Sequence, residues 1–538
     1  MIIGIDFGTT LSAVAYVDNN NNCIVIENEL GSRLTPSYIL FKHDNISIGE
    51  YAMNNVHMYP KNTVYDIKRF IGKEYDKNDI KYMSYEIINQ DNSPIVNIDN
   101  NKYSPTKLAS LIINHMKIIA ESHLGHVVEK AVITVPAYFN DRQRQEIREA
   151  GKLANMEVVR IINEPSAAAL ACNITQGTIM VYDIGGGTLD VTILNVNDDV
   201  YEVLSSCGDA NLGGQDFDNK LLEYCLIKYI TKNILTIQLD KEDKTILLNL
   251  FNISSLNEIF MIDINIVKKY MNTGLYDDYL LQLHEAILLY KNDKMKRKLK
   301  SKCENAKKEL SLKLNTQIIY ECFYNDDDLI IDISRTEFEN ICTNEFKKCI
   351  NPVYDALLSI NMNKDDINNV IIIGGSSRIP KIHKLLVDYF GDKIIVHNNP
   401  DEVVVRGAAI QAGIIDSANK VNNNNELLLI DISNSSFGIE TVDSNGIKTI
   451  DTLIKKNNPL PCSVSKIYST KADNQSSVTI KIYENDKHMG HFTISNIPPM
   501  NKYIPKIEIT FIINIDGILI VSAVEKISNI KGLISFEK

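Results

Sequence analysis

The sequence of 538 residues predicts an α/β domain followed by an antiparallel β-domain. Three observations carry this prediction. Short apolar runs bounded by turns alternate with helical stretches over about the first 415 residues, as in sheets of buried strands with helices between them. Beyond residue 417 the helical periodicity disappears and apolar residues alternate instead. A strand, aspartate, glycine turn and second strand also occur twice, at 1–17 and 180–194, which predicts two similar lobes.

Composition narrows the class of protein further. The net charge of −12 argues against nonspecific binding of nucleic acid, which needs a basic stripe. The nine cysteines form no Cys-x-x-Cys pair, so we expect reduced thiols and a cytoplasmic protein. The first glycine turn begins at Gly4, which leaves no room for a leader peptide. No apolar run approaches the roughly 18 residues of a membrane span, so no membrane partner is expected.

Several elements can be placed in chain order. Buried strands are expected at 131–136, 179–184 and 369–375, where apolar runs end at turns. Apolar residues at three- and four-residue steps within 295–310, from Met295 to Leu310, predict a helix whose many lysines form its solvated face.

The polar, Asn-rich stretch 416–425 predicts a linker. Four apolar residues follow at 427–430, and they form either a tether that docks or the first strand of the β-domain. Alternation over 477–483 and 506–524 predicts strands. In the second run, Asp516-Gly517 marks a hairpin turn, and one face carries Ile507, Ile509, Phe511, Ile513 and Ile515.

The twin turns indicate a phosphate clamp. Glycine lets backbone N–H groups approach a phosphate without interference from Cβ. An aspartate at the end of a strand can hold a cation, usually through water. Two facing turns would clamp a triphosphate, with Mg²⁺ between Asp6 and Asp183. Taken singly, each turn could be an ordinary glycine turn and each aspartate a strand-end cap. No Walker A motif is present.

A set of motifs in a fixed order then resembles the 70-kDa heat-shock chaperones of the DnaK type. The motifs are GIDFGTT (4–10), VYDIKRFIGK (64–73), VITVPAYFNDRQRQ (132–145), RIINEPSAAAL (160–170), YDIGGGTLDV (182–191), GGQDFD (213–218), IIGGSSRIPKI (372–382) and NPDEVVVRGAAIQAG (399–413), followed by LLLIDI, FGIET, STKADNQSSVTI and DGILIVSA. The resemblance covers nearly the whole chain. It implies an actin-like, two-lobed ATPase domain at 1–416, a linker at 417–431 and a peptide-binding β-sandwich at 432–538 without a helical lid. The stretch at about 219–300 is longer than is typical, which predicts an enlarged outer part of the second lobe.

The resemblance also implies roles in ATP hydrolysis. Asp6 and Asp183 would hold Mg²⁺ largely through water, with K⁺ left open, and Thr188 would lie near the γ-phosphate. Lys68, otherwise a surface lysine, would reach the γ-phosphate, and Glu164, otherwise a carboxylate at a helix N-terminus, would help to place the water. Phosphate contacts are implied for Gly8, Thr9, Thr10, Gly185, Gly186, Gly187, Gly213 and Gly214. Nucleoside contacts are implied for Lys307, Lys308, Ser311, Gly374, Gly375, Ser376, Arg378 and Asp401.

Coupling and peptide binding are implied in the same way. Relay of the nucleotide state to the linker is implied for Pro136, Arg144, Leu428, Leu429, Ile430 and Asp431. Arg160 and Asp431 match positions that face J-domain co-chaperones, and a nucleotide-exchange factor is a further expected partner. A peptide pocket is implied for Ile439, Val442, Tyr468, Val478, Ile480 and Ile507, although each could equally be ordinary sandwich core.

The sequence therefore predicts an ATPase with ATP/ADP and Mg²⁺ as ligands. It is expected to act as a chaperone that binds extended apolar peptides in a nucleotide-controlled cycle. One alternative is a lidless regulatory or scaffold relative that binds ATP without trapping clients. Another is a different actin-fold ATPase, such as a sugar kinase or a filament former, against which the linker and the β-domain argue.

Overall fold

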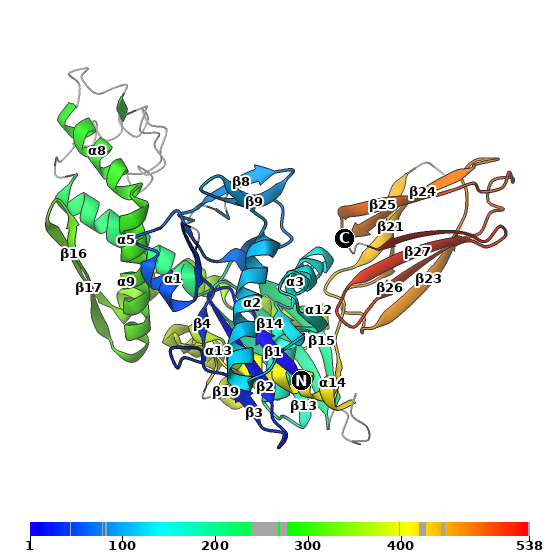
Figure 1. The fold of residues 1–538 in the computed structure, drawn as a ribbon, viewed down its shortest axis with the longest axis horizontal. Coiled ribbons are helices and arrows are strands. Elements are labelled where there is room, and N and C mark those ends of the chain that lie inside the picture. The colour runs from blue at the N-terminus through cyan, green and yellow to red at the C-terminus, as the bar shows by residue number, and fades with distance from the viewer. Residues whose placement is uncertain are drawn as a thin grey trace.

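The computed structural model describes residues 1–43, 45–77, 79–80, 83–198, 200–235, 237, 267–268, 277–396, 399–418, 427–442 and 447–535. Figure 1 shows a two-lobed body on the left and centre and a β-domain that extends from it on the right. Across this part of the chain, every helix is too short or too polar to span a bilayer.

The first lobe is built on a sheet in the order β12-β11-β1-β2-β3, with β4 paired to β2. The strands are β1 (Ile2–Asp6), β2 (Leu11–Val17), β3 (Cys23–Val25), β4 (Thr35–Pro36), β11 (Lys130–Val135) and β12 (Glu157–Asn163). β1 and β2 are antiparallel, whereas β11 and β12 join in parallel. Contacts to the sheet come from α2 (Pro105–Leu124), α3 (Asp141–Leu153) and α14 (Val403–Ala418).

The second lobe repeats this plan. Its sheet runs in the order β19-β18-β13-β14-β15-β20. Its strands are β13 (Gln176–Ile184), β14 (Leu189–Asn197), β15 (Val200–Asp209), β18 (Asn369–Ile373), β19 (Ile394–Val396) and β20 (Leu428–Ile430). An antiparallel meander is again flanked by strands added in parallel. The predicted duplication of the lobes is thus present in the strand topology, and the strands expected near 131–136, 179–184 and 369–375 are β11, β13 and β18.

Two helices join the lobes at their base. α4 (Glu164–Ala171) packs against α14, and both helices share one apolar core with strands of both sheets. Their crossing is close, because a methyl group on Gly407 would overlap the carbonyl group of Ala167. Each sheet also has its own core on its other face. The lobes are therefore hinged on a tightly packed pair of helices.

Smaller elements complete the two lobes. In the first lobe these are β5 (Ile39–Lys42), β6 (Asn45–Ile48), α1 (Glu50–Asn55), β7 (Thr63–Val64), the 3₁₀ helix η1 (Ile67–Phe70), β8 (Glu86–Gln90), β9 (Ser93–Ile98) and β10 (Asn101–Tyr103). In the second they are α5 (Gly214–Asn233), α8 (Asp277–Tyr290), α9 (Asp293–Leu312), β16 (Asn315–Tyr324), β17 (Asp327–Ser334), α10 (Arg335–Ile341), α11 (Thr343–Lys348), α12 (Asn351–Ser359), the 3₁₀ helix η4 (Gly375–Arg378) and α13 (Pro380–Phe390).

The predicted helix at 295–310 lies within α9, with its apolar stripe buried as expected. One part of that prediction is wrong, because not all of the basic residues face solvent: Arg297 and Lys307 are buried. The apolar stripe alone could not reveal this, since the acidic and aromatic partners of these two cations lie on other elements. Within the predicted enlargement at 219–300, residues 236, 238–266 and 269–276 lie outside the part of the chain that the structure describes.

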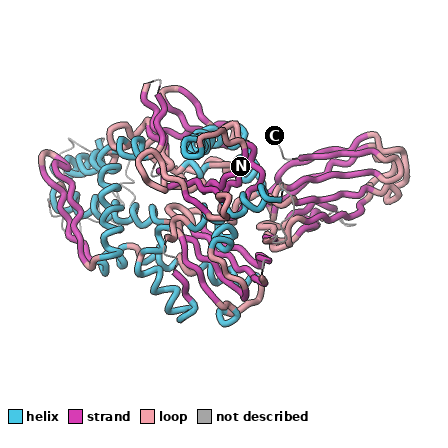
Figure 2. The backbone as a smooth tube through the Cα atoms, turned by 60° about the horizontal axis from the view of Figure 1, so that its bottom comes forward, coloured by secondary structure: helices cyan, strands magenta, loops and turns pink. Residues whose placement is uncertain are grey.

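The β-domain consists of two four-stranded sheets, in the orders β22-β21-β24-β25 and β23-β26-β27-β28. Figure 2 shows these strands as a separate two-layered body. The strands are β21 (Phe437–Val442), β22 (Lys448–Ile454), β23 (Cys462–Tyr468), β24 (Ser477–Glu484), β25 (Lys487–Ser495), β26 (Ile507–Ile513), β27 (Leu519–Glu525) and β28 (Ile530–Ser535). The Asp516-Gly517 turn joins β26 to β27, as predicted. Ile515, expected on the buried face, lies in that turn and is exposed.

Candidate functional site

The two glycine turns face each other between the lobes. The first joins β1 to β2, and the second joins β13 to β14, where the Gly185 N–H donates to the Thr188 carbonyl at 3.0 Å. A methyl group on Gly186 would overlap Thr10 Oγ1, and one on Gly187 would lie 2.9 Å from Thr9 Cγ2. The glycine backbone of the second turn therefore packs against the Thr9 and Thr10 side chains of the first, which is the facing arrangement expected of the clamp.

A cluster of buried and half-buried carboxylates lies beneath the turns. Asp6 ends β1 and accepts a hydrogen bond from the Thr134 hydroxyl at 2.8 Å. Burial and the charge of Glu164 raise the pKa of Asp6 from 3.8 to about 6. Burial, together with Glu164, Asp190 and Asp6, raises the pKa of Asp183 well above its ordinary value. A bound cation would relieve this repulsion, so these carboxylates fit a magnesium site.

The described side chains of the cleft offer little direct ligation of a metal. Among the residues that the structure describes, no group of three or more His, Cys, Asp or Glu side chains could hold a metal ion. Asp190 is occupied as well, because its carboxylate accepts the Ala137 N–H at 3.1 Å. The donor set therefore suits a hydrated cation better than one ligated mainly by protein.

Lys68 and Glu164 form a buried ion pair in the same cleft. Lys68 lies in η1 with a side chain that is 3% exposed, and its ammonium lies 5.6 Å from the centre of the Phe7 ring. Glu164 is the first residue of α4 and is followed by Pro165, which suits the start of a helix. Lys68 is thus no surface lysine, and the structure brings it together with Glu164 across the first lobe.

The start of α5 closes the site from the second lobe. The N–H groups of Gly214 and Gln215 donate to the carbonyls of Gly185 and Gly186 at 3.0 and 2.9 Å. The Gln215 amide also donates to Thr10 Oγ1 at 3.2 Å and to Asp66 Oδ1 at 2.6 Å. This glutamine ties both turns to the segment before Lys68. Sequence reasoning did not single it out, because nothing in the motif distinguishes its side chain from its neighbours.

The predicted nucleoside residues gather on the second lobe. Lys307 Nζ donates to the Gly214 carbonyl and to Asp218, each at 2.9 Å, and a methyl group on Gly214 would collide with Ser376. Gly374 adopts φ +81° beside Asp183, a conformation that favours glycine. The remaining contacts are between predicted residues or near neighbours: Arg378 with Asp401 at 2.9 Å, Ser311 with the Lys307 carbonyl at 3.4 Å, and Lys308 with Glu304 at 2.7 Å.

The linker is docked on the second lobe. β20 pairs in parallel with β15, with Leu428, Leu429 and Ile430 opposite Val200, Tyr201 and Glu202. Leu429 is buried, whereas Leu428 is half exposed. Of the two interpretations open for this segment, the structure contains the docked strand, since β20 extends the sheet of the second lobe rather than either sheet of the sandwich.

Asp431 begins the contact between the domains. Its carboxylate accepts a hydrogen bond from the Asn163 amide at 2.7 Å, and Asn163 Oδ1 accepts one from Arg144 at the same distance. Burial lowers the pKa of Arg144, and burial raises that of Asp431. Pro136 lies just before this group, its carbonyl accepting the Phe139 N–H at 3.1 Å, and Arg160 lies close enough to Asp431 and Asp516 to feel their charges.

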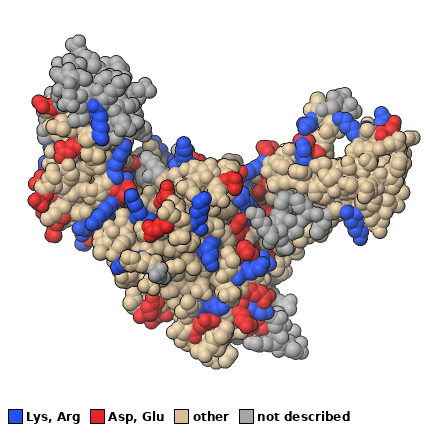
Figure 3. Space-filling view, turned by 45° about the horizontal axis from the view of Figure 1, so that its top comes forward, with Lys and Arg blue, Asp and Glu red and all other residues tan. Residues whose placement is uncertain are grey.

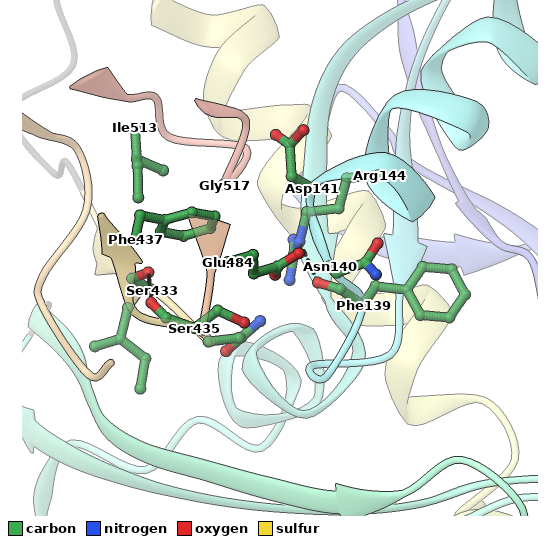
Figure 4. Close-up of a pocket in the computed structure, with 12 residues that line it drawn as sticks. Phe139, Asn140, Asp141, Arg144, Ser433, Ser435, Phe437, Glu484, Ile513 and Gly517 are labelled. Atoms are coloured by element: carbon green, nitrogen blue, oxygen red, sulfur yellow. Dashed lines mark hydrogen bonds between the residues drawn. The ribbon is translucent and has the colours of Figure 1, made fainter. Parts of the chain in front are cut away.

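A turn of the sandwich inserts beside Arg144. Asp516 forms an ion pair with Arg148 and accepts the Ile161 N–H at 2.8 Å, and the Leu519 N–H donates to Asp141 at 2.7 Å. Figure 4 shows Arg144, Asp141, Gly517 and Glu484 around a pocket of about 260 Å³ between the domains. The sequence marked Asp516 only as a turn residue, so its interdomain role was missed.

The predicted peptide-binding positions are divided between core and surface. Ile439, Ile480 and Ile507 are buried in the sandwich core. Val478 and Tyr468 are half-buried against that core, and the Tyr468 hydroxyl donates to Asp451 at 2.9 Å. Val442 is 40% exposed. The structure thus places five of the six in or against one core, and Val442 lies outside that cluster.

Comparisons with known proteins agree with this architecture. The family model described as Hsp70 protein matches residues 2–251 and 277–538, so the internal unmatched stretch, 252–276, lies within the predicted enlargement. The heat shock 70 kDa protein of Neurospora crassa is 34% identical over 566 residues, covering 100% of this chain and 79% of that protein. The heat shock cognate 70 kDa protein 3 of Dictyostelium discoideum is 35% identical over 569 residues, covering 99% of this chain and 81% of that protein.

These matches confirm the family, the fold class and the activity predicted from the sequence. Family members are ATPases that bind ATP or ADP with Mg²⁺ and that bind unfolded peptides and co-chaperones. The kinase, filament and scaffold alternatives are not favoured. The chain belongs to the Hsp70 family, and it is an ATP-dependent molecular chaperone with an actin-like ATPase domain and a β-sandwich.

Proposed function

We propose that ATP is hydrolysed between the two glycine turns, where Lys68 and Glu164 position the attacking water. The observation that carries the proposal is the buried Lys68–Glu164 pair next to Asp6 and Asp183. The ammonium of Lys68 places positive charge where a γ-phosphate would gain negative charge. Glu164 fixes that ammonium and can accept a proton from water. Little covalent chemistry is asked of the protein, which mainly orients the reactants.

The same geometry supports the other assignments around the nucleotide. The turns, with Gly8, Thr9, Thr10, Gly185, Gly186 and Gly187, would hold the phosphates, and Thr188 would lie near the γ-phosphate. Bound Mg²⁺ would neutralise the phosphates and would be held by Asp6 and Asp183 largely through water. K⁺, if the reaction uses it, belongs in this acidic cleft. Gly213 and Gly214 would shape the phosphate side, and the nucleoside would lie against Lys307, Lys308, Ser311, Gly374, Gly375, Ser376, Arg378 and Asp401.

We infer the binding partners and the cellular location from features outside the nucleotide cleft. An extended apolar peptide would bind around Tyr468, which packs against the sandwich core, and around the exposed Val442. A J-domain co-chaperone would face Arg160 and Asp431, and an exchange factor would act on the outer second lobe. A cytoplasmic location is supported by the nine cysteines, all within the described residues and all free thiols.

A single-turnover assay with Lys68→Ala tests the catalytic assignment. Loss of the ammonium should lower the hydrolysis rate by about 100-fold or more, as for removal of a charge-stabilising group. Binding of ATP, measured by calorimetry, should persist, because the turns are unchanged. Lys61→Ala is the matched control, since Lys61 is an exposed lysine of the same segment. Hydrolysis by Lys68→Ala at the wild-type rate would refute the assignment.

A second arm tests the peptide assignment. An extended apolar peptide should accelerate turnover of the wild type, and Tyr468→Ala should require a higher peptide concentration for the same acceleration. If the peptide binds but Tyr468→Ala leaves its affinity unchanged, the pocket lies elsewhere on the sandwich.

A further inference from the structure

A second pocket lies between the lobes, apart from the glycine turns. It is an open pocket whose empty space, counted together with adjoining solvent, is about 340 Å³, and its lining includes Ser84 of the first lobe, Asn219 of α5 and Asp293, Lys296, Arg297 and Lys300 of α9. None of these residues belongs to the predicted nucleotide site. Lys300 and Lys307 are separated by about 10 Å along α9, at 1.5 Å per residue. The pocket is therefore a distinct place where the two lobes meet.

Its lining carries more positive than negative charge. Three cations of α9 face one lining carboxylate, that of Asp293, which is 3.3 Å from Lys296. Asp66 and Asp218 lie near Lys300 from outside the lining. Burial and the repulsion of Arg297 nevertheless lower the pKa of Lys300 to about 8, so these carboxylates do not compensate its charge. Figure 3 shows Lys and Arg side chains gathered on this face over the left-hand part of the molecule, where α9 lies in Figure 1.

Arg297 provides the second observation. The residue is 7% exposed, and its guanidinium lies flat on the Tyr65 ring of the first lobe, 3.5 Å from the ring centre. Its Nε and Nη2 are buried and have no hydrogen-bond partner among the described residues, and the same holds for Asn219 Oδ1. Buried guanidinium N–H groups are costly unless they are paired, and their fork suits a carboxylate or phosphate.

We propose that this pocket binds a free phosphate or sulfate ion that bridges the lobes and slows nucleotide release. The ion would accept hydrogen bonds from Arg297 and pair with Lys296 and Lys300, against the wall of the pocket that Met83 and Ser84 of the first lobe provide. It would strengthen the contact that Arg297 already makes with Tyr65. Because the nucleotide also lies between the lobes, the two ligands would bind cooperatively. The proposal depends on ADP binding in the cleft, so that binding is measured first.

The test compares release of fluorescent ADP in sodium sulfate and in sodium chloride at equal ionic strength. Saturating sulfate should slow release from the wild type by about fivefold or more, the lower end of typical coupling between sites. Lys296→Gln with Lys300→Gln should abolish the slowing. The matched control is Lys294→Gln with Lys302→Gln, which removes two exposed lysines from the same helix and should respond as the wild type does.

The affinity for ADP without sulfate shows whether each variant retains its cleft. If the variant with both Lys296→Gln and Lys300→Gln has lost affinity for ADP, Lys296→Gln alone replaces it. The Lys296 side chain is 26% exposed at the rim, so this single change should disturb the fold less. The single variant should need a severalfold higher sulfate concentration than the wild type to reach the same slowing of ADP release. The proposal is overturned if sulfate does not slow the wild type. It is also overturned if the pocket variants slow as much as the wild type, because sulfate would then act at the γ-phosphate position.

Discussion

At the scale of single residues, the clustered carboxylates of the cleft lower the stability of the folded protein when no cation is bound. Asp183, Asp190 and Glu164 are buried beside the half-buried Asp6, and Lys68 is the cation that enters all of their electrostatic balances. Such a cluster is unfavourable until a cation arrives, which is how a binding site comes to be selective for charge. The two aspartate–glycine turns identify two of these residues, Asp6 and Asp183, from the sequence alone. Gln215 and Asp516 could not be found in this way, because their partners are set by tertiary contacts.

Asp6→Asn should stabilise the protein in the absence of nucleotide and metal. The pKa of Asp6 is raised from 3.8 to about 6, so the folded state keeps a proton that the unfolded chain loses as the pH rises. The stability that Asp6 contributes is therefore present below pH 4 and is lost as the pH rises to about 6. At pH 7.5 the variant should gain up to about 3 kcal/mol in free energy of unfolding.

Guanidinium denaturation at several pH values measures this gain, which should shrink steadily from pH 6 to pH 4. Asp392→Asn, at an exposed aspartate, is the control and should change stability little. The same Asp6→Asn variant should bind Mg-ADP more weakly. If the variant is less stable than the wild type at pH 7.5, the ionised Asp6 carboxylate does not destabilise the folded protein.

At the scale of elements, local patterns predicted a limited set of helices and strands, and the structure contains each of them. The strands around the turns, the helix α9 and the hairpin β26–β27 follow from local patterns, because each buries one face against its own lobe or sheet. The position of β20 in the sheet could not be predicted from such local patterns. Four apolar residues after a polar, Asn-rich run favour a docked tether but also fit the first strand of a sandwich, and the free edge of β15 decides between them.

Leu429→Asp should release β20 from the second lobe. Leu429 is buried among Val196, Tyr201 and Val203, so a carboxylate there would have to be desolvated without a partner. Peptide should then no longer accelerate ATP hydrolysis, while the basal rate persists. Leu428→Asp is a stringent control, because side chains alternate along a strand and Leu428 is 51% exposed. Equal loss of acceleration in both variants would indicate that the strand acts through its backbone rather than through the buried Leu429.

At the scale of the whole molecule, one chain of polar contacts joins the nucleotide lobes to the sandwich. From Arg144 of α3 it runs through Asn163 to Asp431 of the linker, and in the other direction to the backbone carbonyl of Asp516. The Ile161 N–H of β12 adds a second contact to the Asp516 carboxylate. The overall plan could be predicted because motifs from both domains are present in order. The contact itself could not, since Asp516 is a common turn residue and only its position opposite Arg148 gives it a role.

Asp516→Ala should uncouple the domains while leaving each of them folded. The substitution removes the ion pair with Arg148 and leaves the Ile161 N–H without its acceptor, and unpaired buried groups of this kind cost about 1–3 kcal/mol each. The docked arrangement should therefore become less populated, and ATP should no longer accelerate release of a fluorescent peptide. Asp486→Ala, at an exposed aspartate in the turn between β24 and β25, removes the same charge from the sandwich and should leave that acceleration intact. If Asp516→Ala releases peptide in ATP as fast as the wild type, the Asp516 contacts are not needed for communication, and the docked strand β20 must carry it alone.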